Sequence, residues 1–184
     1  ETRAAARNLG LVTADKPESV EICFVPDDDY VSVLEQRLPE DAPALAPGPL
    51  VTTSGEVIGE HDGFARYTIG QRRGLPGGFA EPLYVVAIRP ETREVVVGPG
   101  ARLFGHEVSL EEVNWLAEPL GLGDPVWVQC RYRARAVPGT VAALAPADAS
   151  LRLQLAEPVR AIAPGQSGVL YDADDRLLGG GVIA

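Results

Sequence analysis

The sequence has no methionine, a single lysine, and only two cysteines and two histidines among its 184 residues. Two cysteines cannot build the disulfide framework of a small secreted domain, so we expect a reducing, cytoplasmic setting. One disulfide, Cys23 with Cys130, is left open by the sequence. His61 and His106 have no cysteine or histidine neighbours at ligand spacing, so we expect no zinc site. No apolar run reaches the ~18 residues of a membrane span, and no signal peptide opens the chain.

The start of the chain also lacks a methionine and a helix-capping residue. It opens with ETRAAARNLGL, a pattern that predicts a short helix ending at Gly10. We therefore expect the chain to be the C-terminal part of a longer protein. The glycine-rich segments GLPGG and LLGGGV do not fit the phosphate-binding pattern G-x-x-x-x-G-K-[ST]. The triple glycine 179–181 is expected to form a bulge or a close contact between strands.

The formal net charge of −10 argues against nucleic acid as a partner, because phosphate contacts from Lys and Arg dominate such binding. The charge is uneven, however, since nine acidic residues fall between Asp15 and Asp41. Arginines concentrate in IGQRRG (69–74) and CRYRARA (130–136). Local patches decide binding, so both segments are candidate RNA contacts, with a solvated strand face as the alternative.

Two elements are predicted before a proline-rich linker. VEICFV (20–25) is rich in β-branched and aromatic residues and predicts a strand. YVSVLEQRL (30–38) predicts a helix, and the acidic run 27–29 favours a helix start. Four prolines in PEDAPALAPGP (39–49) mark a linker.

From Leu50 onward, short alternating strands and turns predict a small barrel or sandwich, with hairpins over 50–61 and 84–97. The predicted fold class is therefore mainly β, preceded by a short α/β tail of a truncated N-terminal domain. The predicted domains are the tail at 1–46, a small β-rich central domain at 47–105 and a C-terminal β-barrel at 106–184.

The segment PVWVQCRYRARAV (125–137) is predicted to be one continuous strand. Alternation divides its side chains between an apolar face and an arginine-bearing face. The apolar face holds Val126, Val128, Cys130 and Tyr132, and the other face holds Trp127, Gln129, Arg131, Arg133 and Arg135.

Cys23 lies between Ile22 and Phe24, directly after the loop DKPES. A free cysteine is most often a buried, small apolar residue, and this interpretation is stronger still for Cys130. The alternative for Cys23 is a working thiol, because sulfur transfer needs a nucleophilic cysteine on a mobile segment. The residues by themselves leave both interpretations open.

Several motifs, met in order from about Asp15 to Ile183, resemble the C-terminal half of the tRNA-specific 2-thiouridylases. These motifs are SVEICFV, GEHDGFARYTIGQRRGL, PLYVVAIRPETREVVVGP, EEVNWL, RYRARAVPGTV and EPVRAIAPGQSGVLYD. The resemblance implies an N-terminal ATP pyrophosphatase domain, a central domain and a β-barrel. It also implies adenylation of C2 of the wobble uridine and replacement of its oxygen by sulfur. ATP and Mg²⁺ would serve the intact enzyme at a site outside this chain.

The resemblance implies roles for individual residues. Cys23 matches the cysteine that carries the transferable sulfur as a persulfide. The implied tRNA contacts are Arg131, Tyr132 and Gln166, with Arg72, Arg73 and Arg133 as further candidates.

The chain departs from the family pattern in two places. The pyrophosphatase loop S-G-G-x-D-S is absent, and so is the second catalytic cysteine, which Cys130 does not match. We therefore expect the chain by itself to be inactive. Its expected partners are tRNA, an upstream sulfur-carrier protein and the missing N-terminal domain, and no membrane is expected. The alternative is a standalone RNA- or protein-binding β-module in which Cys23 is purely structural.

Overall fold

The computed structural model describes residues 2–15, 25, 29–145, 147 and 149–184, and it divides into two compact units, 1–42 and 43–184. The first unit holds α1 (Thr2–Asn8) and α2 (Tyr30–Arg37), as predicted. Asp29 begins α2 by accepting a hydrogen bond from the Ser32 N–H at 3.1 Å, which is the capping role expected of that carboxylate. The predicted strand 20–25 falls mostly outside the described residues, and Cys23 lies outside them. None of the helices described is long and apolar enough to cross a membrane.

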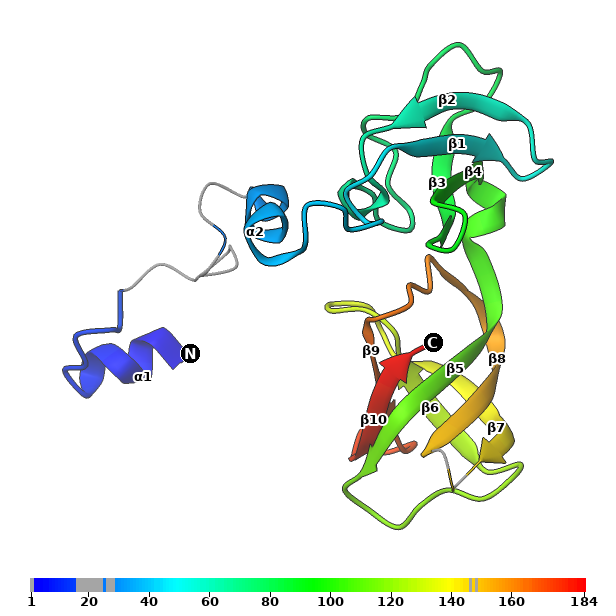
Figure 1. Cartoon of the computed structure of the whole chain (residues 1–184). Helices are drawn as coiled ribbons and strands as arrows, with labels where there is room; N and C mark the ends of the chain where they lie inside the picture. Colours follow the sequence, from blue (N-terminus) through cyan, green and yellow to red (C-terminus); the bar gives the residue numbers. More distant parts are fainter. Residues whose placement is uncertain (1, 16–24, 26–28, 146, 148) are drawn as a thin grey trace. The chain divides into compact units, whose positions relative to one another are not determined.

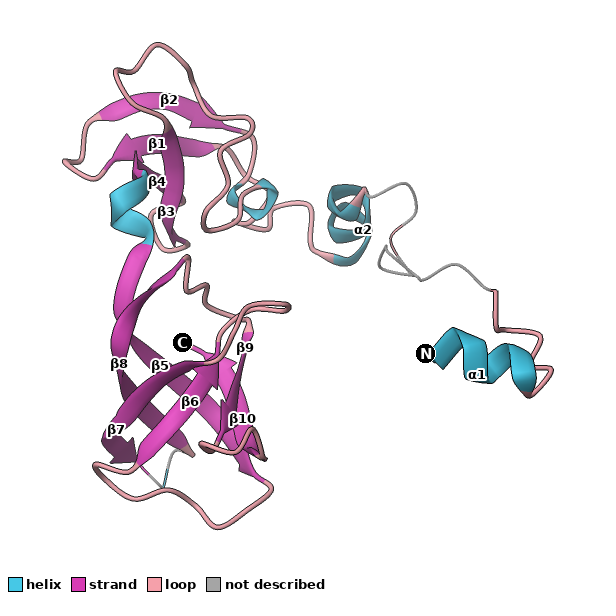
Figure 2. Cartoon of the chain, turned by 180° about the vertical axis from the view of Figure 1, so that it is seen from behind, coloured by secondary structure: helices cyan, strands magenta, loops and turns pink. Residues whose placement is uncertain are grey.

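The second unit begins with a four-stranded sheet (Figures 1 and 2). Its strands are β1 (Gly48–Thr52), β2 (Val57–His61), β3 (Leu83–Arg89) and β4 (Glu94–Pro99), arranged in the order β2-β1-β4-β3. Both predicted hairpins are confirmed, since β1 pairs antiparallel with β2 and β3 pairs antiparallel with β4. The two hairpins are joined by a parallel pairing of β1 with β4, which local sequence did not predict.

His61 is the one buried polar or charged residue among those described, with 3% of its surface exposed. Its Nδ1 accepts a hydrogen bond from the Gly63 N–H at 3.0 Å, and its Nε2 lies 2.9 Å from the Arg93 carbonyl oxygen. Because Nδ1 accepts a hydrogen bond, Nε2 carries the ring proton and donates a hydrogen bond to the Arg93 carbonyl oxygen. His61 therefore ties the end of β2 to the β3–β4 turn and has a structural role.

The rest of the second unit is a closed six-stranded barrel (Figure 1). The strands in chain order are β5 (Phe104–Trp115), β6 (Pro125–Gln129), β7 (Val137–Ala145), β8 (Ser150–Arg160), β9 (Ser167–Tyr171) and β10 (Leu177–Ile183). Around the barrel they run β10-β5-β8-β7-β6-β9, so no edge is left unpaired. The predicted mainly β fold with a C-terminal barrel is confirmed, while the three domain boundaries stay a prediction.

Alternation along β8 shows how the sequence fills the barrel. Leu151, Leu153 and Leu155 are buried, and the residues between them are exposed. These leucines pack with valines of β6 and with Leu110 of β5 in one continuous core. Period-two alternation points one set of side chains inward, and closure of the barrel buries that set completely.

One predicted strand is wrong in its length. β6 ends at Gln129, and the chain then turns, so 125–137 is not one strand. Tyr132 is 88% exposed instead of lying on the apolar face. Arg131, Arg133 and Arg135 therefore do not share a strand face, because they lie in the loop between β6 and β7. Three arginines in five residues are better accommodated in a solvated loop than in a short barrel strand.

Candidate functional site

The β6–β7 loop, residues 130–136, projects from the end of the barrel at which the C-terminus lies (Figure 1). A tight turn forms within it, since the Ala134 N–H donates to the Arg131 carbonyl at 3.1 Å and Arg133 has a φ of 62°. The Gln129 side chain holds the turn, because its Nε2 donates to the Ala134 carbonyl at 2.6 Å. The same amide accepts a hydrogen bond from the Tyr171 hydroxyl at 3.3 Å. The loop is thus fixed to the barrel wall at its base.

Strand register brings Gln166 to the same end of the barrel. Gln129 of β6 opposes Val169 of β9 in an antiparallel pair, so residues after Gln129 run beside residues before Val169. Gln166 directly precedes β9, in a turn where its N–H donates to the Ala163 carbonyl. The sequence-predicted residues Arg131, Tyr132 and Gln166 therefore lie at one end of the barrel, which we call the arginine end.

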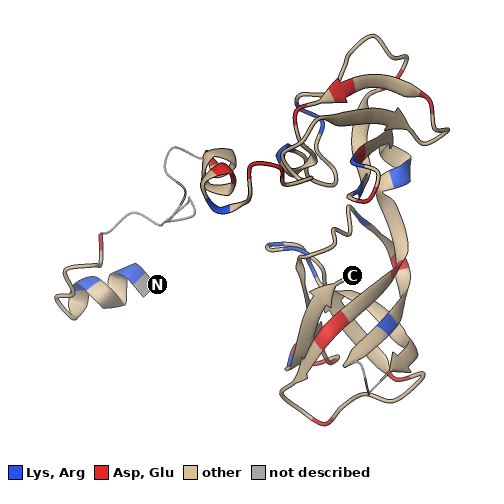
Figure 3. Ribbon diagram, viewed as in Figure 1, with Lys and Arg blue, Asp and Glu red and all other residues tan. Residues whose placement is uncertain are grey.

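A cavity of about 390 Å³ opens between the β6–β7 loop and the end of β8. Four arginines line it, namely Arg131, Arg133, Arg135 and Arg160. Glu157, the one carboxylate in the lining, forms an ion pair with Arg135. Basic residues gather on this loop, while the loops at the other end of the barrel carry acidic residues (Figure 3). The cavity is therefore electropositive although the chain is acidic.

The aromatic ring of Tyr132 also stands in this cavity. The guanidinium carbon of Arg133 lies 5.2 Å from the centroid of the Tyr132 ring, within cation–π range. Exposed aromatic rings stack on unpaired bases, and arginines bind phosphates with two parallel hydrogen bonds. The arginine end therefore has the chemistry of a surface that binds single-stranded or looped RNA.

Arg160 and Gln129 were not singled out from the sequence. The Arg160 guanidinium lines the cavity and lies 5.3 Å from the centroid of the Tyr84 ring. The motif EPVRAI contains Arg160, yet nothing local indicated that the last residue of β8 would reach the β6–β7 loop. Only the pairing of β7 with β8 brings these segments together.

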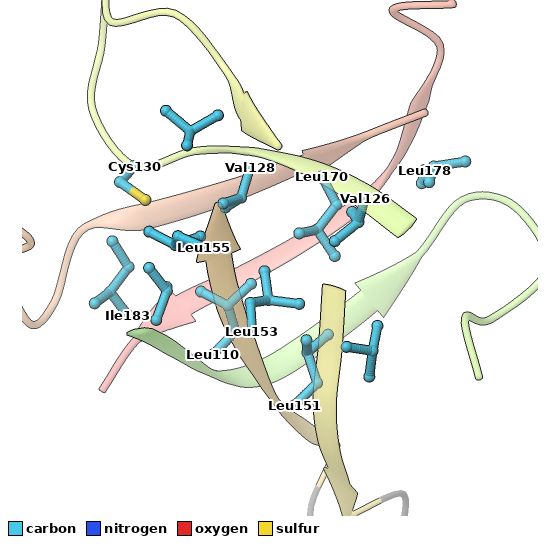
Figure 4. Packing of buried hydrophobic residues seen from close by; sticks show 13 residues of the cluster. Leu110, Val126, Val128, Cys130, Leu151, Leu153, Leu155, Leu170, Leu178 and Ile183 are labelled. Carbon is cyan, nitrogen blue, oxygen red and sulfur yellow. The ribbon is translucent and has the colours of Figure 1, made fainter. Parts of the chain in front are cut away.

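Cys130 forms part of the cavity floor and is a free, buried thiol with 2% of its surface exposed. It packs with Val128 and Leu155 in the barrel core (Figure 4). Burial raises the pKa of the Cys130 thiol to about 11, so it stays protonated at neutral pH and is a poor nucleophile. The interpretation of Cys130 as a buried, small apolar residue is confirmed.

The other candidates lie elsewhere. Arg72 and Arg73 are exposed in the loop between Tyr67 and Pro82, and Arg72 lines a separate cavity of about 420 Å³ that also includes Phe79. Gln71 braces this loop, since its Nε2 donates to the Arg73 carbonyl at 2.9 Å. Cys23 lies outside the described residues. Within the described part of the chain, no group of three or more potential metal-ligating side chains occurs.

Two family models match the chain. The first, described as a tRNA methyl transferase PRC-barrel domain, matches residues 32–99. The second, described as an aminomethyltransferase beta-barrel domain, matches residues 105–183. The first match ends with β4, the last strand of the four-stranded sheet in chain order, and the second begins within β5, the first strand of the barrel.

Curated relatives match the chain over its whole length. It is 46% identical to the tRNA-specific 2-thiouridylase MnmA of Roseobacter denitrificans, over 100% of this chain and 48% of the relative. The protein of the same name from Rhodospirillum centenum is also 46% identical, with 47% of its length covered. Over its whole length the chain is similar to part of the tRNA-specific 2-thiouridylases. The 2-thiouridylase of Rhodospirillum rubrum is similar as well, at 44% identity and 49% of its length. The chain thus spans about half the length of the curated 2-thiouridylases it matches.

Proposed function

We propose that this chain is the tRNA-binding and sulfur-carrying part of an enzyme that makes 2-thiouridine at the wobble position of tRNA. The arginine end carries this proposal, because Arg131 and Tyr132 line an electropositive cavity there and Gln166 lies at the same end of the barrel. The match of the whole chain to about half the length of proteins named tRNA-specific 2-thiouridylase supplies the substrate class. In this proposal Arg131 and Arg133 bind phosphate, Tyr132 stacks on a base, and Gln166 hydrogen-bonds the same RNA segment.

The remaining roles belong to the intact enzyme. ATP with Mg²⁺ would activate C2 of the uridine in an N-terminal domain, since this sequence contains no phosphate-binding loop. Cys23 would carry the incoming sulfur as a persulfide, received from a sulfur-carrier protein in the cytoplasm, where tRNA is modified. Arg72 and Arg73 would add phosphate contacts from the central sheet domain. Domain boundaries near residues 46 and 105 complete the proposal.

The RNA part of the proposal is tested with Arg131→Ala in the full-length enzyme. We expect tRNA binding to weaken by about 1–3 kcal/mol if Arg131 reads a base, or the salt slope to fall by about one if it contacts a phosphate. Fluorescence anisotropy of labelled tRNA at several salt concentrations measures both quantities.

A matched control is Arg152→Ala, which removes the same charge from an exposed position on the outer wall of β8. This variant should bind tRNA nearly as well as the unaltered enzyme. Equal affinity and equal salt slope for the two variants would show that the arginine end is not part of the tRNA-binding surface.

The sulfur-transfer part is tested with Cys23→Ser in the same enzyme. Oxygen does not carry transferable sulfur, so 2-thiouridine formation with a physiological sulfur donor should be lost. Cys130→Ser should remain active, because the Cys130 thiol is buried and protonated. Mass spectrometry of the tRNA and alkylation mapping of the persulfide read out both variants. A persulfide that mapped to Cys130 would contradict this assignment.

A further inference from the structure

A second hollow lies at the end of the barrel opposite the arginine end. Its volume is about 330 Å³, and apolar side chains of β5, the β5–β6 loop, β7 and β8 form most of its walls. Trp115 and Leu120 line it together with Leu144 and Leu151. Trp115, Leu120 and Leu144 also pack on the barrel core, of which Leu151 is part. The folded barrel therefore presents this hollow ready-formed.

Exposed leucines surround this end of the barrel. Leu116, which directly follows Trp115, is 64% exposed, and Leu122 in the β5–β6 loop is 71% exposed. Leu177 at the start of β10 is exposed as well. A single exposed leucine is ordinary, but several beside an apolar hollow are typical of a binding surface. We call this surface, with the hollow and Leu116, Leu122 and Leu177, the leucine end.

Carboxylates dominate the loops of the leucine end. The β5–β6 and β9–β10 loops contain five of them, Glu118, Asp124, Asp172, Asp174 and Asp175, against one arginine, Arg176. Arg176 is paired with Asp172 at 2.9 Å, and Asp124 accepts a hydrogen bond from the Gly121 N–H at 2.7 Å. Glu118, Asp174 and Asp175 are exposed. The rim of the leucine end is therefore negative.

We propose that the leucine end docks a cationic amphipathic segment of another protein. Large apolar side chains of that segment would enter the hollow, and its lysines or arginines would face Glu118, Asp174 and Asp175. RNA and anionic lipid are disfavoured by the negative rim, and a symmetric pair of two copies would place carboxylates against carboxylates. The inference stands independently of the RNA proposal, because the two surfaces lie at opposite ends of the barrel strands.

The surface offers its own fluorescent reporter, because Trp115 lines the hollow and Trp127 is the only other tryptophan. In a Trp127→Phe background of the 184-residue chain, we titrate a synthetic 15-residue peptide of leucine and lysine with helical spacing. We expect a saturable change in Trp115 emission. Combined Leu116→Ala and Leu122→Ala substitutions should raise the Kd about tenfold, equivalent to about 1.4 kcal/mol.

Three controls separate docking from general charge attraction. A peptide with serine in place of leucine keeps the charge, and one with glutamate in place of lysine keeps the apolar side chains; both should bind at least tenfold more weakly. Leu9→Ala with Leu11→Ala removes two exposed leucines outside the barrel and should leave the Kd unchanged.

Three results would overturn the proposal. The first is equal affinity for the serine peptide or for the Leu116/Leu122 variant. The second is a saturable Trp115 response to phosphatidylglycerol vesicles of the same strength as that to the peptide. The third is self-association of the chain in sedimentation velocity that is lost in the Leu116/Leu122 variant, which would show that a second copy occupies the surface.

Discussion

Cys130 and Tyr132 are only two residues apart, yet their environments are opposite. The Cys130 side chain is buried in the barrel core, whereas Tyr132 is 88% exposed and its ring lies beside Arg133. β6 ends at Gln129, just before both residues, so strand alternation no longer applies to either of them. A thiol in the core stabilises the barrel as a small apolar group, and a ring in solvent is free to stack on a ligand.

The buried thiol predicts a pH dependence of stability. The pKa of Cys130 is raised from 9.0 to about 11 in the folded chain, so above pH 9 the unfolded chain releases this proton first. Unfolding is therefore favoured as pH rises, and the stabilising contribution of the protonated thiol is present below about pH 9 and lost towards pH 11. Urea unfolding at pH 7.5 and pH 10.5 should show a lower midpoint at the higher pH.

Cys130→Ala provides the comparison for this pH effect. The variant lacks the ionising group, so its midpoint should fall less between the two pH values than that of the unaltered chain. Equal falls in the two proteins would mean that Cys130 is not shielded from water in the way its burial indicates.

At the scale of single elements, β10 shows why the chain carries three consecutive glycines. β10 lies between β5 and β9, and its pairing shifts register on both sides. A Cβ at Gly179 would lie 2.4 Å from the Asn114 carbonyl oxygen, and one at Gly181 would lie 2.5 Å from that of Glu111. The expectation of close strand packing at 179–181 is confirmed, since side chains there would force the barrel open.

Gly181→Ala should therefore destabilise the barrel. Its Cβ would meet a backbone oxygen, which cannot move as a flexible side chain can, and overpacking of this kind costs about 1–3 kcal/mol. Thermal unfolding followed by circular dichroism measures the loss. Gly77→Ala is the control, because a Cβ at Gly77 would meet nothing within 4 Å. If both variants melted together, the contact between β10 and β5 would be looser than described.

The whole chain combines a net charge of −10 with a barrel whose two ends have opposite local charge. A strongly acidic protein is a poor candidate for RNA binding if only its net charge is considered. A negative ligand at the arginine end would lie close to the arginines, while many of the carboxylates lie on other loops. Salt screens the repulsion between such carboxylates and the ligand beyond about 8–10 Å. Local charge thus permits RNA binding at one end and discourages it at the other.

At the same scale, we predict that the 184-residue chain neither binds ATP tightly nor forms 2-thiouridine. The sequence has no S-G-G-x-D-S loop and no Walker-type phosphate loop that could hold the nucleotide. Isothermal titration of Mg²⁺–ATP into the chain should give no saturable heat at micromolar concentrations.

A full-length 2-thiouridylase is the positive control and should give a saturable titration. Micromolar, magnesium-dependent binding by the 184-residue chain would show that it contains a nucleotide site that its motifs do not reveal.

The sequence by itself determined the mainly β fold, both hairpins of the first sheet, the strand-rich barrel, the burial of Cys130 and the resemblance to the tRNA-specific 2-thiouridylases. These features depend on local signals, since alternation, turn glycines and ordered motifs can be read within a few residues of one another. The tertiary structure decided where β6 ends, the parallel pairing of β1 with β4 and the placement of Arg131 and Gln166 at one end of the barrel. It also brought Arg160 to the cavity and separated the two charged ends of the barrel. Each of these depends on which strands pair and in what register, and pairing energies between segments far apart in the chain leave no local mark in the sequence.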